Sequence, residues 1–200
     1  MSKNDENEIK VILVGESGTG KTSLINVAVG LSFNPDIVTT SSSTYVQKNF
    51  QISGKEYILN LWDTIGQERY RSLTKIFIKD SKIVIFVYDI TKKKTFDELE
   101  FWIKTIEEIL GKEIIIGIVG NKNDLYLNEK VKEEVALKYA KSKGAFFKTT
   151  SAKADPLSFI KFLELLLVEY IKKNKGGINE NNKKGKKLKR KVTATEKSCC

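Results

Sequence analysis

The chain has 200 residues, 40% of them apolar and 30% charged, which suits one ordinary domain with its own core plus a tail. Its formal net charge is +10 at pH 7, but the stretch from Ile171 to Cys200 alone contains 11 basic and 2 acidic residues. The remaining 24 basic and 23 acidic residues nearly balance, which argues against a groove-reading fold and leaves a basic arm of the kind that contacts an anionic membrane or nucleic acid.

Short apolar segments alternate with helical patterns along the chain. Continuous apolar runs are typical of strands buried on both faces of a parallel sheet, and the turn at residues 53–55 predicts one early hairpin. The predicted strands are Ile9–Val14, Tyr45–Ile52, Tyr57–Trp62, Ile83–Tyr88, Ile114–Val119 and Ala145–Thr149, and the predicted helices are Lys21–Val29, Phe96–Leu110, Glu129–Ser142 and Pro156–Tyr170. This order predicts an α/β fold with a mostly parallel six-stranded sheet flanked by helices at residues 1–173, followed by a disordered polybasic tail at 174–200.

The first motif lies between the first predicted strand and the first predicted helix. Residues 15–22 read GESGTGKT and match G-x4-G-K-[ST], the pattern of a phosphate-binding P-loop. Glycines let backbone N–H groups point at phosphate oxygens, Lys21 supplies positive charge for the β- and γ-phosphates, and the Thr22 hydroxyl can bind Mg²⁺. The residues expected to contact the nucleotide here are Gly15, Ser17, Gly18, Thr19, Gly20, Lys21, Thr22 and Ser23. A Gly-rich turn formed by chance is the alternative, and the motif alone indicates a nucleoside triphosphate rather than GTP.

Two polar segments at the ends of later strands predict which base is bound. The segment N-K-N-D at residues 121–124 ends a buried strand, where open α/β sheets bind ligands. The Asp124 carboxylate can accept both neighbouring donors of guanine, N1–H and the 2-amino group, which adenine lacks. The stem of Lys122 can cover one face of the base, and the N–H of Ala152 can donate to guanine O6. The predicted base-contacting residues are Asn121, Lys122, Asp124, Ser151, Ala152 and Lys153; for N-K-N-D alone, a surface Asn/Asp turn is the alternative.

A third segment follows the third predicted strand and reads D-T-I-G-Q at residues 63–67. A carboxylate at Asp63 suits Mg²⁺ through a water, Gly66 offers a backbone N–H to the γ-phosphate, and Gln67 can orient the attacking water. The pattern D-x-x-G is common by itself. Its position in the sequence between the P-loop and N-K-x-D is what makes it an informative sign of γ-phosphate and Mg²⁺ binding.

Together these motifs resemble the Ras superfamily of small GTPases, and most closely its Rab family. The continuation Arg69–Thr74 and the terminal Cys199-Cys200 also resemble Rab proteins, so the resemblance extends over nearly the whole chain. It implies that residues 1–173 are a monomeric GTPase domain that binds GTP or GDP with Mg²⁺. It also implies a GTP-on, GDP-off switch that hydrolyses GTP slowly without help and regulates vesicle traffic.

The resemblance also assigns roles to single residues. Phe33 is expected to pack against the guanine, and Thr40 to bind Mg²⁺ and the γ-phosphate. The implied catalytic residues are Gln67, Lys21 and Thr40, the implied metal ligands are Thr22, Thr40 and Asp63, and the implied effector-binding aromatic residues are Tyr45, Trp62 and Phe77. For Trp62, partial burial in the sheet is an equally open interpretation.

Two departures from the family pattern leave alternatives open. Residues 39–44 are rich in hydroxyls and lack the usual Ile/Val and Gly, so Thr39 remains an alternative to Thr40. Ile65 stands where the family has alanine, and its β-branched side chain predicts slower hydrolysis than in an Ile65→Ala variant. A GTP-binding module with little hydrolysis of its own is therefore the main alternative; a nucleic-acid-binding protein is disfavoured by the neutral body.

The sequence also predicts partners for the GTPase cycle. No arginine occurs from Met1 to Thr40 that would complete the catalytic site within the chain. We therefore expect a separate GTPase-activating protein, together with an exchange factor and effector proteins.

The end of the chain predicts attachment to a membrane. Cys199 and Cys200 are the only cysteines, and a body without them suits a reducing compartment. The polar start Met1–Glu8 lacks a signal sequence, Ser2 excludes N-myristoylation, and no apolar run is long enough to span a bilayer. The resemblance implies geranylgeranylation of both cysteines, the prenylation machinery and a GDP-dissociation inhibitor as partners, and cycling between cytosol and the cytoplasmic face of an intracellular membrane. Two lipids and the polybasic run Lys183–Lys191 would anchor the chain stably; an unmodified tail or a nuclear-import signal is the alternative.

Overall fold

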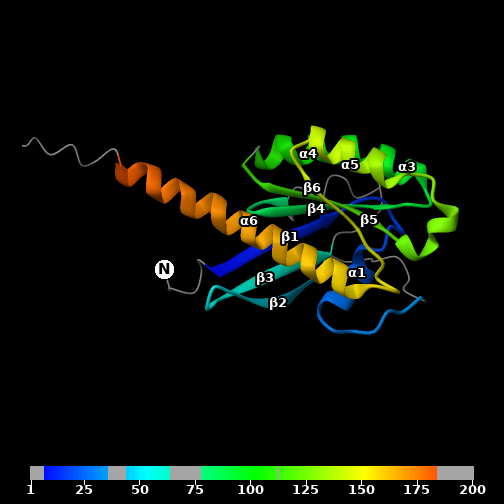
Figure 1. The fold of residues 1–200 in the computed structure, drawn as a ribbon, viewed down its shortest axis with the longest axis horizontal. Helices are drawn as coiled ribbons and strands as arrows, with labels where there is room; N and C mark the ends of the chain where they lie inside the picture. The colour runs from blue at the N-terminus through cyan, green and yellow to red at the C-terminus, as the bar shows by residue number, and fades with distance from the viewer. Residues whose placement is uncertain (1–6, 36–43, 64–77, 112, 184–200) are drawn as a thin grey trace, which may run out of the picture.

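The computed structural model describes residues 7–35, 44–63, 78–111 and 113–183 (Figure 1). Six strands form one sheet in the order β2-β3-β1-β4-β5-β6; β2 and β3 pair antiparallel, and all other neighbours pair parallel. The strands are β1 (Glu8–Val14), β2 (Thr44–Ile52), β3 (Lys55–Asp63), β4 (Ile83–Asp89), β5 (Ile115–Asn121) and β6 (Phe146–Thr149). The predicted α/β fold with a mostly parallel six-stranded sheet is therefore confirmed.

The burial of β4 and β5 explains why their sequences are continuously apolar. Every residue of β4 and of β5 is buried, because helices cover both faces of the sheet. The polar residues Asp63, Asp89 and Asn121 are each the last residue of a strand. Strands β3 and β4 each pair parallel with β1, and β5 pairs parallel with β4, so these three residues lie along the same edge of the sheet.

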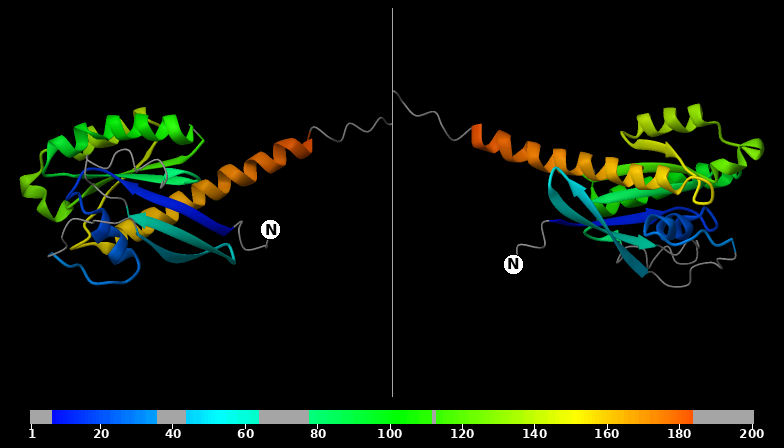
Figure 2. Two further views of the ribbon diagram at one scale, coloured as in Figure 1. Left: turned by 180° about the vertical axis from the view of Figure 1, so that it is seen from behind. Right: turned by 60° about the horizontal axis from the view of Figure 1, so that its bottom comes forward.

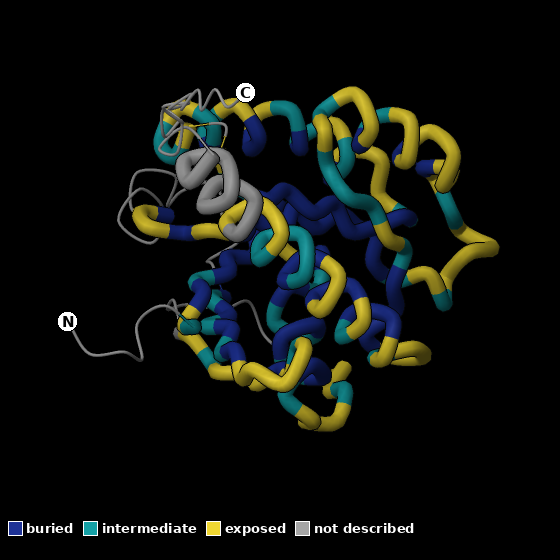
Figure 3. Tube along the Cα trace, turned by 60° about the vertical axis from the view of Figure 1, so that its left-hand side comes forward, coloured by how far each residue is buried: buried dark blue, intermediate teal, exposed yellow. Residues whose placement is uncertain are grey.

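The helices lie on both faces of the sheet (Figures 1 and 2). On one face are α1 (Lys21–Ala28) and α6 (Pro156–Lys183), and on the other are α3 (Lys93–Asp97), α4 (Leu99–Leu110) and α5 (Glu133–Ser142). Two separate cores result, one containing Leu24 and Phe159 and the other containing Trp102 and Ala136. Figure 3 shows the buried strands between helices whose outward turns are exposed. Each layer therefore buries one apolar stripe, as expected for this class of fold.

Two helices differ in their bounds from those predicted from the sequence. The predicted helix at residues 96–110 is two helices, α3 and α4, which meet at Glu98. The predicted helix at residues 129–142 begins only at Glu133, after a 3-10 segment η3 (Asn123–Asn128) and an extended Glu129. The acidic residues Glu133 and Glu134 occupy the first turn of α5, where the helix dipole stabilises negative charge.

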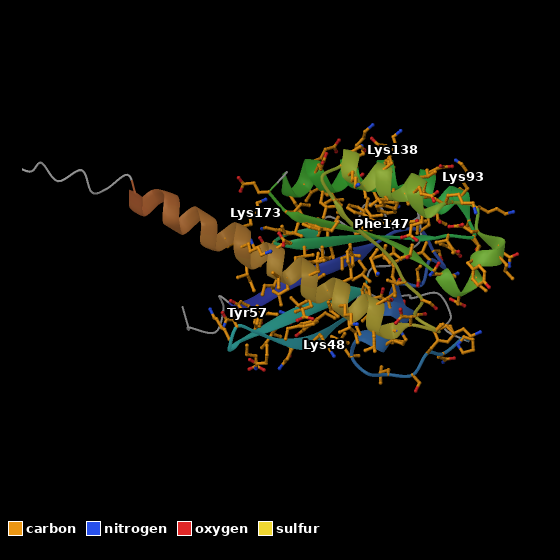
Figure 4. All side chains as sticks on the ribbon, viewed as in Figure 1. Lys48, Tyr57, Lys93, Lys138, Phe147 and Lys173 are labelled. Carbon is orange, nitrogen blue, oxygen red and sulfur yellow. The ribbon has the colours of Figure 1, made fainter. Side chains whose placement is uncertain are left out.

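Helix α6 carries the predicted apolar stripe and extends beyond its predicted end. Its buried members are Phe159, Phe162, Leu163, Leu166 and Leu167, while Tyr170 is partly buried. The helix continues to Lys183, past the expected start of the tail at residue 174, although residues 174–183 include two glycines and four asparagines, which are weak helix formers. Lys173, labelled on α6 in Figure 4, donates from Nζ to the carbonyl oxygen of Glu113 at 2.7 Å, just before β5 begins. The division of the chain at residues 173 and 174 stays a prediction, and in the described part of the chain no helix has the length and apolar content needed to cross a bilayer.

Candidate nucleotide-binding site

The P-loop connects β1 to α1, the structural context that its motif requires. Gly15 and Gly20 have positive φ angles of 150° and 94°. A Cβ atom at Gly15 would overlap the Val87 carbonyl oxygen, and one at Gly20 would overlap the side-chain amide of Asn121. Both positions therefore need glycine for backbone conformation and for close approach. Around them Thr19 is buried, Ser23 is partly buried, and Ser17 and Gly18 are exposed.

Lys21 folds back over this loop. Its Nζ donates to the carbonyl oxygens of Gly15 at 2.8 Å and of Glu16 at 3.0 Å, and only 5% of the residue is exposed. Burial lowers the pKa of Lys21 to about 8, against the opposing effect of the Asp63 and Glu16 carboxylates. A cation buried at this cost is suited to an anionic ligand, which would stabilise its charged form.

Thr22 and Asp63, two of the predicted magnesium ligands, lie in contact. The Thr22 hydroxyl donates to Asp63 Oδ2 at 2.6 Å, and Asp63 is 4% exposed at the end of β3. Within the described ranges, no group of three or more His, Cys, Asp or Glu residues exists that would hold a metal ion alone. One hydroxyl and one carboxylate beside a phosphate loop nevertheless fit Mg²⁺, which keeps several waters and takes its other ligands from phosphate oxygens.

Asn121 connects three loops at the edge of the sheet. Its Nδ2 donates to the Thr19 carbonyl oxygen at 2.9 Å, and its Oδ1 accepts bonds from Thr150 Oγ1 and from the Ala152 N–H, each at 3.3 Å. Thr150 and Thr19 are buried, at 1% and 0% exposure. Asn121 thus couples the P-loop to both predicted base-binding segments. The Ala152 N–H, expected to face guanine O6, points in this structure at Asn121; its role toward guanine stays a prediction.

Asp124 and Ser151 form the second link between the base-binding segments. The Ser151 hydroxyl donates to Asp124 Oδ1 at 2.6 Å and accepts the Ala154 N–H at 2.9 Å. Ser151 is 3% exposed and Asp124 is partly exposed, while Lys153 is exposed. One carboxylate oxygen is thereby held by the protein, which fixes the orientation of the group expected to read guanine.

Sequence reasoning did not identify two of the residues at this edge, Asp89 and Thr150. Lys122 Nζ lies 2.7 Å from Oδ2 of Asp89, the last residue of β4. Thr150, the residue after β6, binds Asn121 as described above and accepts the Asn123 N–H at its carbonyl oxygen. The available signal was their position, since each follows a predicted strand at its carboxyl end.

Phe33 lies in a half-buried position near the base-binding loops. It lines a cavity of about 390 Å³ together with Ala152, Lys153 and residues from the end of α1 and the start of α6. The structure therefore places Phe33 on the same cavity as Ala152 and Lys153, while its packing against guanine stays a prediction.

The exposed aromatic residues of β2 and β3 stack on each other. The rings of Tyr45 and Trp62 lie 4.9 Å apart at 21°, Tyr45 is 52% exposed, and Lys10 Nζ lies 4.6 Å from the centre of the Trp62 ring. Trp62 also packs against the core on the α4 side of the sheet. Trp62 is therefore partly buried in the sheet, and its role in effector binding stays a prediction.

Several predicted residues lie outside the described ranges. They are Thr39, Thr40, Ile65, Gly66, Gln67, Phe77, Cys199 and Cys200. Their roles stay predictions.

A phosphate loop at the carboxyl edge of a mostly parallel sheet defines a P-loop nucleotide-binding protein. The sequence profile of the Ras family matches residues 10–166, more than half of the chain. The chain therefore belongs to the Ras family of small GTPases, which are GTP hydrolases. Guanine-nucleotide binding with Mg²⁺, and interactions with exchange factors, activating proteins and effectors, are general properties of this family.

Individual relatives place the chain more narrowly. It is 42% identical over 156 residues to Ras-related protein Rab-21 of Geodia cydonium, an alignment that covers 78% of this chain and 68% of the relative. Human Rab-21 is 42% identical over 146 residues, covering 73% and 65% of the two chains, and human Rab-22A is 36% identical over 196 residues, covering 96% and 98%. The aligned region thus spans about two thirds of Rab-21 and nearly all of Rab-22A. The chain is a Rab-like small GTPase.

Proposed function

We propose that this chain is a GTP- and GDP-dependent switch that binds guanine nucleotide with Mg²⁺ and regulates intracellular vesicle and membrane traffic. The observation that carries the proposal is the set of bonds from Asn121 to the P-loop and to the segment after β6. These bonds join the elements suited to phosphate with the elements suited to a base. A single nucleotide can therefore engage both at once.

Charge neutralisation at the phosphates is the first task of the site. When nucleotide binds, the Lys21 ammonium would exchange its hydrogen bonds to the P-loop carbonyls for bonds to the β- and γ-phosphates. The backbone N–H groups of the loop and the N-terminus of α1 would surround the same phosphates. Thr22 and Asp63 are the residues that would hold Mg²⁺, one directly and one through a water. When bound, Mg²⁺ supplies positive charge that offsets the charge developing on the phosphate oxygens.

Selection of guanine is the second task, and it falls to Asp124. Its carboxylate, oriented by Ser151, has acceptor capacity for the N1–H and 2-amino donors of guanine. Adenine has neither donor there, so it would leave a desolvated carboxylate with unmet hydrogen bonds, at a cost of about 1–3 kcal/mol or more.

The switch itself depends on residues of the two loops that contact the γ-phosphate. In this proposal Thr40 and the Gly66 N–H hold those loops while GTP is bound, and hydrolysis releases them. Gln67 orients the attacking water, and an activating protein completes the site. Effectors read Tyr45, Trp62 and Phe77 when the loops are ordered.

Membrane attachment is proposed for the carboxyl-terminal end of the chain. Lipids on Cys199 and Cys200 would act together with the polybasic run, since one chain gives marginal binding and two signals give stable anchoring. A GDP-dissociation inhibitor would then account for cycling with the cytosol.

Identification of the nucleotide that copurifies with the chain tests this proposal directly. We expect GDP or GTP in about equal amount to the protein, followed by slow GTP turnover that an activating protein accelerates. Absence of guanine nucleotide, or an equal content of adenine nucleotide, would contradict the proposal.

A further inference from the structure

Asp89 is a buried carboxylate at the nucleotide edge of the sheet. It ends β4, pairs in register with Asn121 on β5, and is 1% exposed. Its Oδ2 lies 2.7 Å from Nζ of Lys122, whose side chain keeps 31% of its surface exposed. A buried carboxylate is therefore paired with a lysine that remains partly exposed within the proposed base-binding segment.

The other carboxylate oxygen of Asp89 is fixed by its own strand end. Oδ1 accepts the Thr91 N–H at 2.9 Å and the Thr91 hydroxyl at 2.7 Å. Burial acts to raise the pKa of Asp89, but hydrogen bonds from Lys122 and Thr91 outweigh it and hold the pKa below its ordinary value. Asp89 is thus a charged acceptor with a set orientation, one side of which is directed at Lys122.

The backbone of Lys122 needs such support. It adopts a left-handed conformation with φ 67° and ψ 35°, which is unfavourable for a residue with a side chain. The next residue continues directly into the base-binding segment, where the Asn123 N–H bonds the Thr150 carbonyl oxygen. The ion pair with Asp89 at the end of the Lys122 side chain restricts the direction of its stem.

We propose that Asp89 is a positioning residue for nucleotide binding, which holds the Lys122 ammonium at the end of β4 so that the Lys122 stem stays extended over the guanine. This inference rests on the proposed function. A role in fold stability alone is the competing explanation, but a buried ion pair stabilises a fold no better than apolar side chains of similar volume. A role in positioning Lys122 explains why a charged carboxylate lies buried at this edge of the sheet.

The test measures release of a fluorescent GDP analogue from the full-length, Mg²⁺-loaded chain. We expect Asp89→Asn to release it about tenfold faster than wild type or more, because Lys122 loses its charged partner. Asp97→Asn is the matched control, since Asp97 makes an exposed 2.6 Å ion pair with Lys93 on α3, and it should release the analogue at the wild-type rate. Wild-type release by Asp89→Asn would overturn the inference.

A double-mutant cycle separates positioning from general stability. If Asp89 acts through Lys122, Asp89→Asn added to Lys122→Met should release the analogue no faster than Lys122→Met alone. The same acceleration in both backgrounds would show that Asp89 acts by another route and would overturn the inference.

Thr91→Val keeps the Asp89 charge and covers the case in which Asp89→Asn does not fold. It removes one bond to Asp89 and should accelerate release by about two- to fivefold, whereas wild-type release would count against the inference. A wild-type chain that holds no guanine nucleotide would overturn the proposed function as well. Tight binding by wild type with unchanged release in the variants would overturn only the role of Asp89.

Discussion

The side-chain amide of Asn121 donates a 2.9 Å hydrogen bond to the backbone carbonyl oxygen of Thr19, across 102 positions in the sequence. The bond is buried, and it joins the end of β5 to the P-loop. The P-loop and the segment proposed to bind the base are therefore joined by a buried hydrogen bond. This link explains how one ligand can be held by loops from distant parts of the chain.

Replacement of Asn121 by alanine should weaken both the fold and nucleotide retention. The Thr19 carbonyl and the Thr150 hydroxyl would lose a buried partner, at a cost of about 1–3 kcal/mol in the free energy of unfolding. Denaturant unfolding measures this loss. Asn49→Ala, which removes an exposed bond to Glu56 on the β2–β3 hairpin, should cost less than about 0.5 kcal/mol. Equal losses in the two variants would contradict the linking role of Asn121.

Gly20→Ala should destabilise the chain more than glycine conformation alone explains. Its Cβ would overlap the Asn121 amide in addition to the strain of a φ of 94°. Gly54→Ala in the hairpin is the control, because its φ is 77° and its surroundings are open, so it should cost only about 1–2 kcal/mol. We expect the Gly20 variant to lose about 1–3 kcal/mol more in denaturant unfolding. Similar losses at both positions would mean that the close approach to Asn121 is unimportant.

Nucleotide affinity should fall as the pH rises above about 8. Burial lowers the pKa of Lys21 in the free protein to about 8, and a bound polyphosphate raises it again. Below this pH Lys21 of the nucleotide-free protein already carries its positive charge, so the affinity for nucleotide is at its full value. Above it, binding must take up a proton, and affinity falls by up to about tenfold per pH unit. Calorimetry of GDP binding in buffers of different ionisation enthalpy measures the proton directly.

The control for this proton is Lys10→Met. The pKa of Lys10 is also lowered by burial, although Asp80 opposes the shift, but Lys10 lies beside Trp62 rather than at the P-loop. Its variant should retain proton uptake on GDP binding. Absence of uptake by wild type above pH 8 would contradict the assignment to Lys21.

The strands and the P-loop were predictable because their signals are local. Continuous apolar runs identified β4 and β5, and glycine spacing identified the turn at residues 15–22. The length of α6 was not predictable from its stripe, since the helix continues through mainly polar residues beyond Tyr170 and Ile171, which still pack against the core. The stripe marks what is buried, whereas helix length also depends on backbone propagation.

The contacts between residues of the site were less predictable than the residues themselves. The motif identified Asn121, Lys122 and Asp124, but not that Lys122 meets Asp89 or that the Ala152 N–H bonds Asn121. Such contacts depend on which strands become neighbours and in what register. Because β4 and β5 are buried on both faces, their continuous apolar runs do not specify which strand lies beside them or in what register.

Competition between GTP and ATP for the loaded chain tests the central claim most directly. With a fluorescent GDP analogue bound in Mg²⁺, GTP should displace it at concentrations about tenfold to a hundredfold lower than ATP, because only guanine satisfies the Asp124 carboxylate. Displacement by ATP and GTP at equal concentrations would contradict a guanine-specific site.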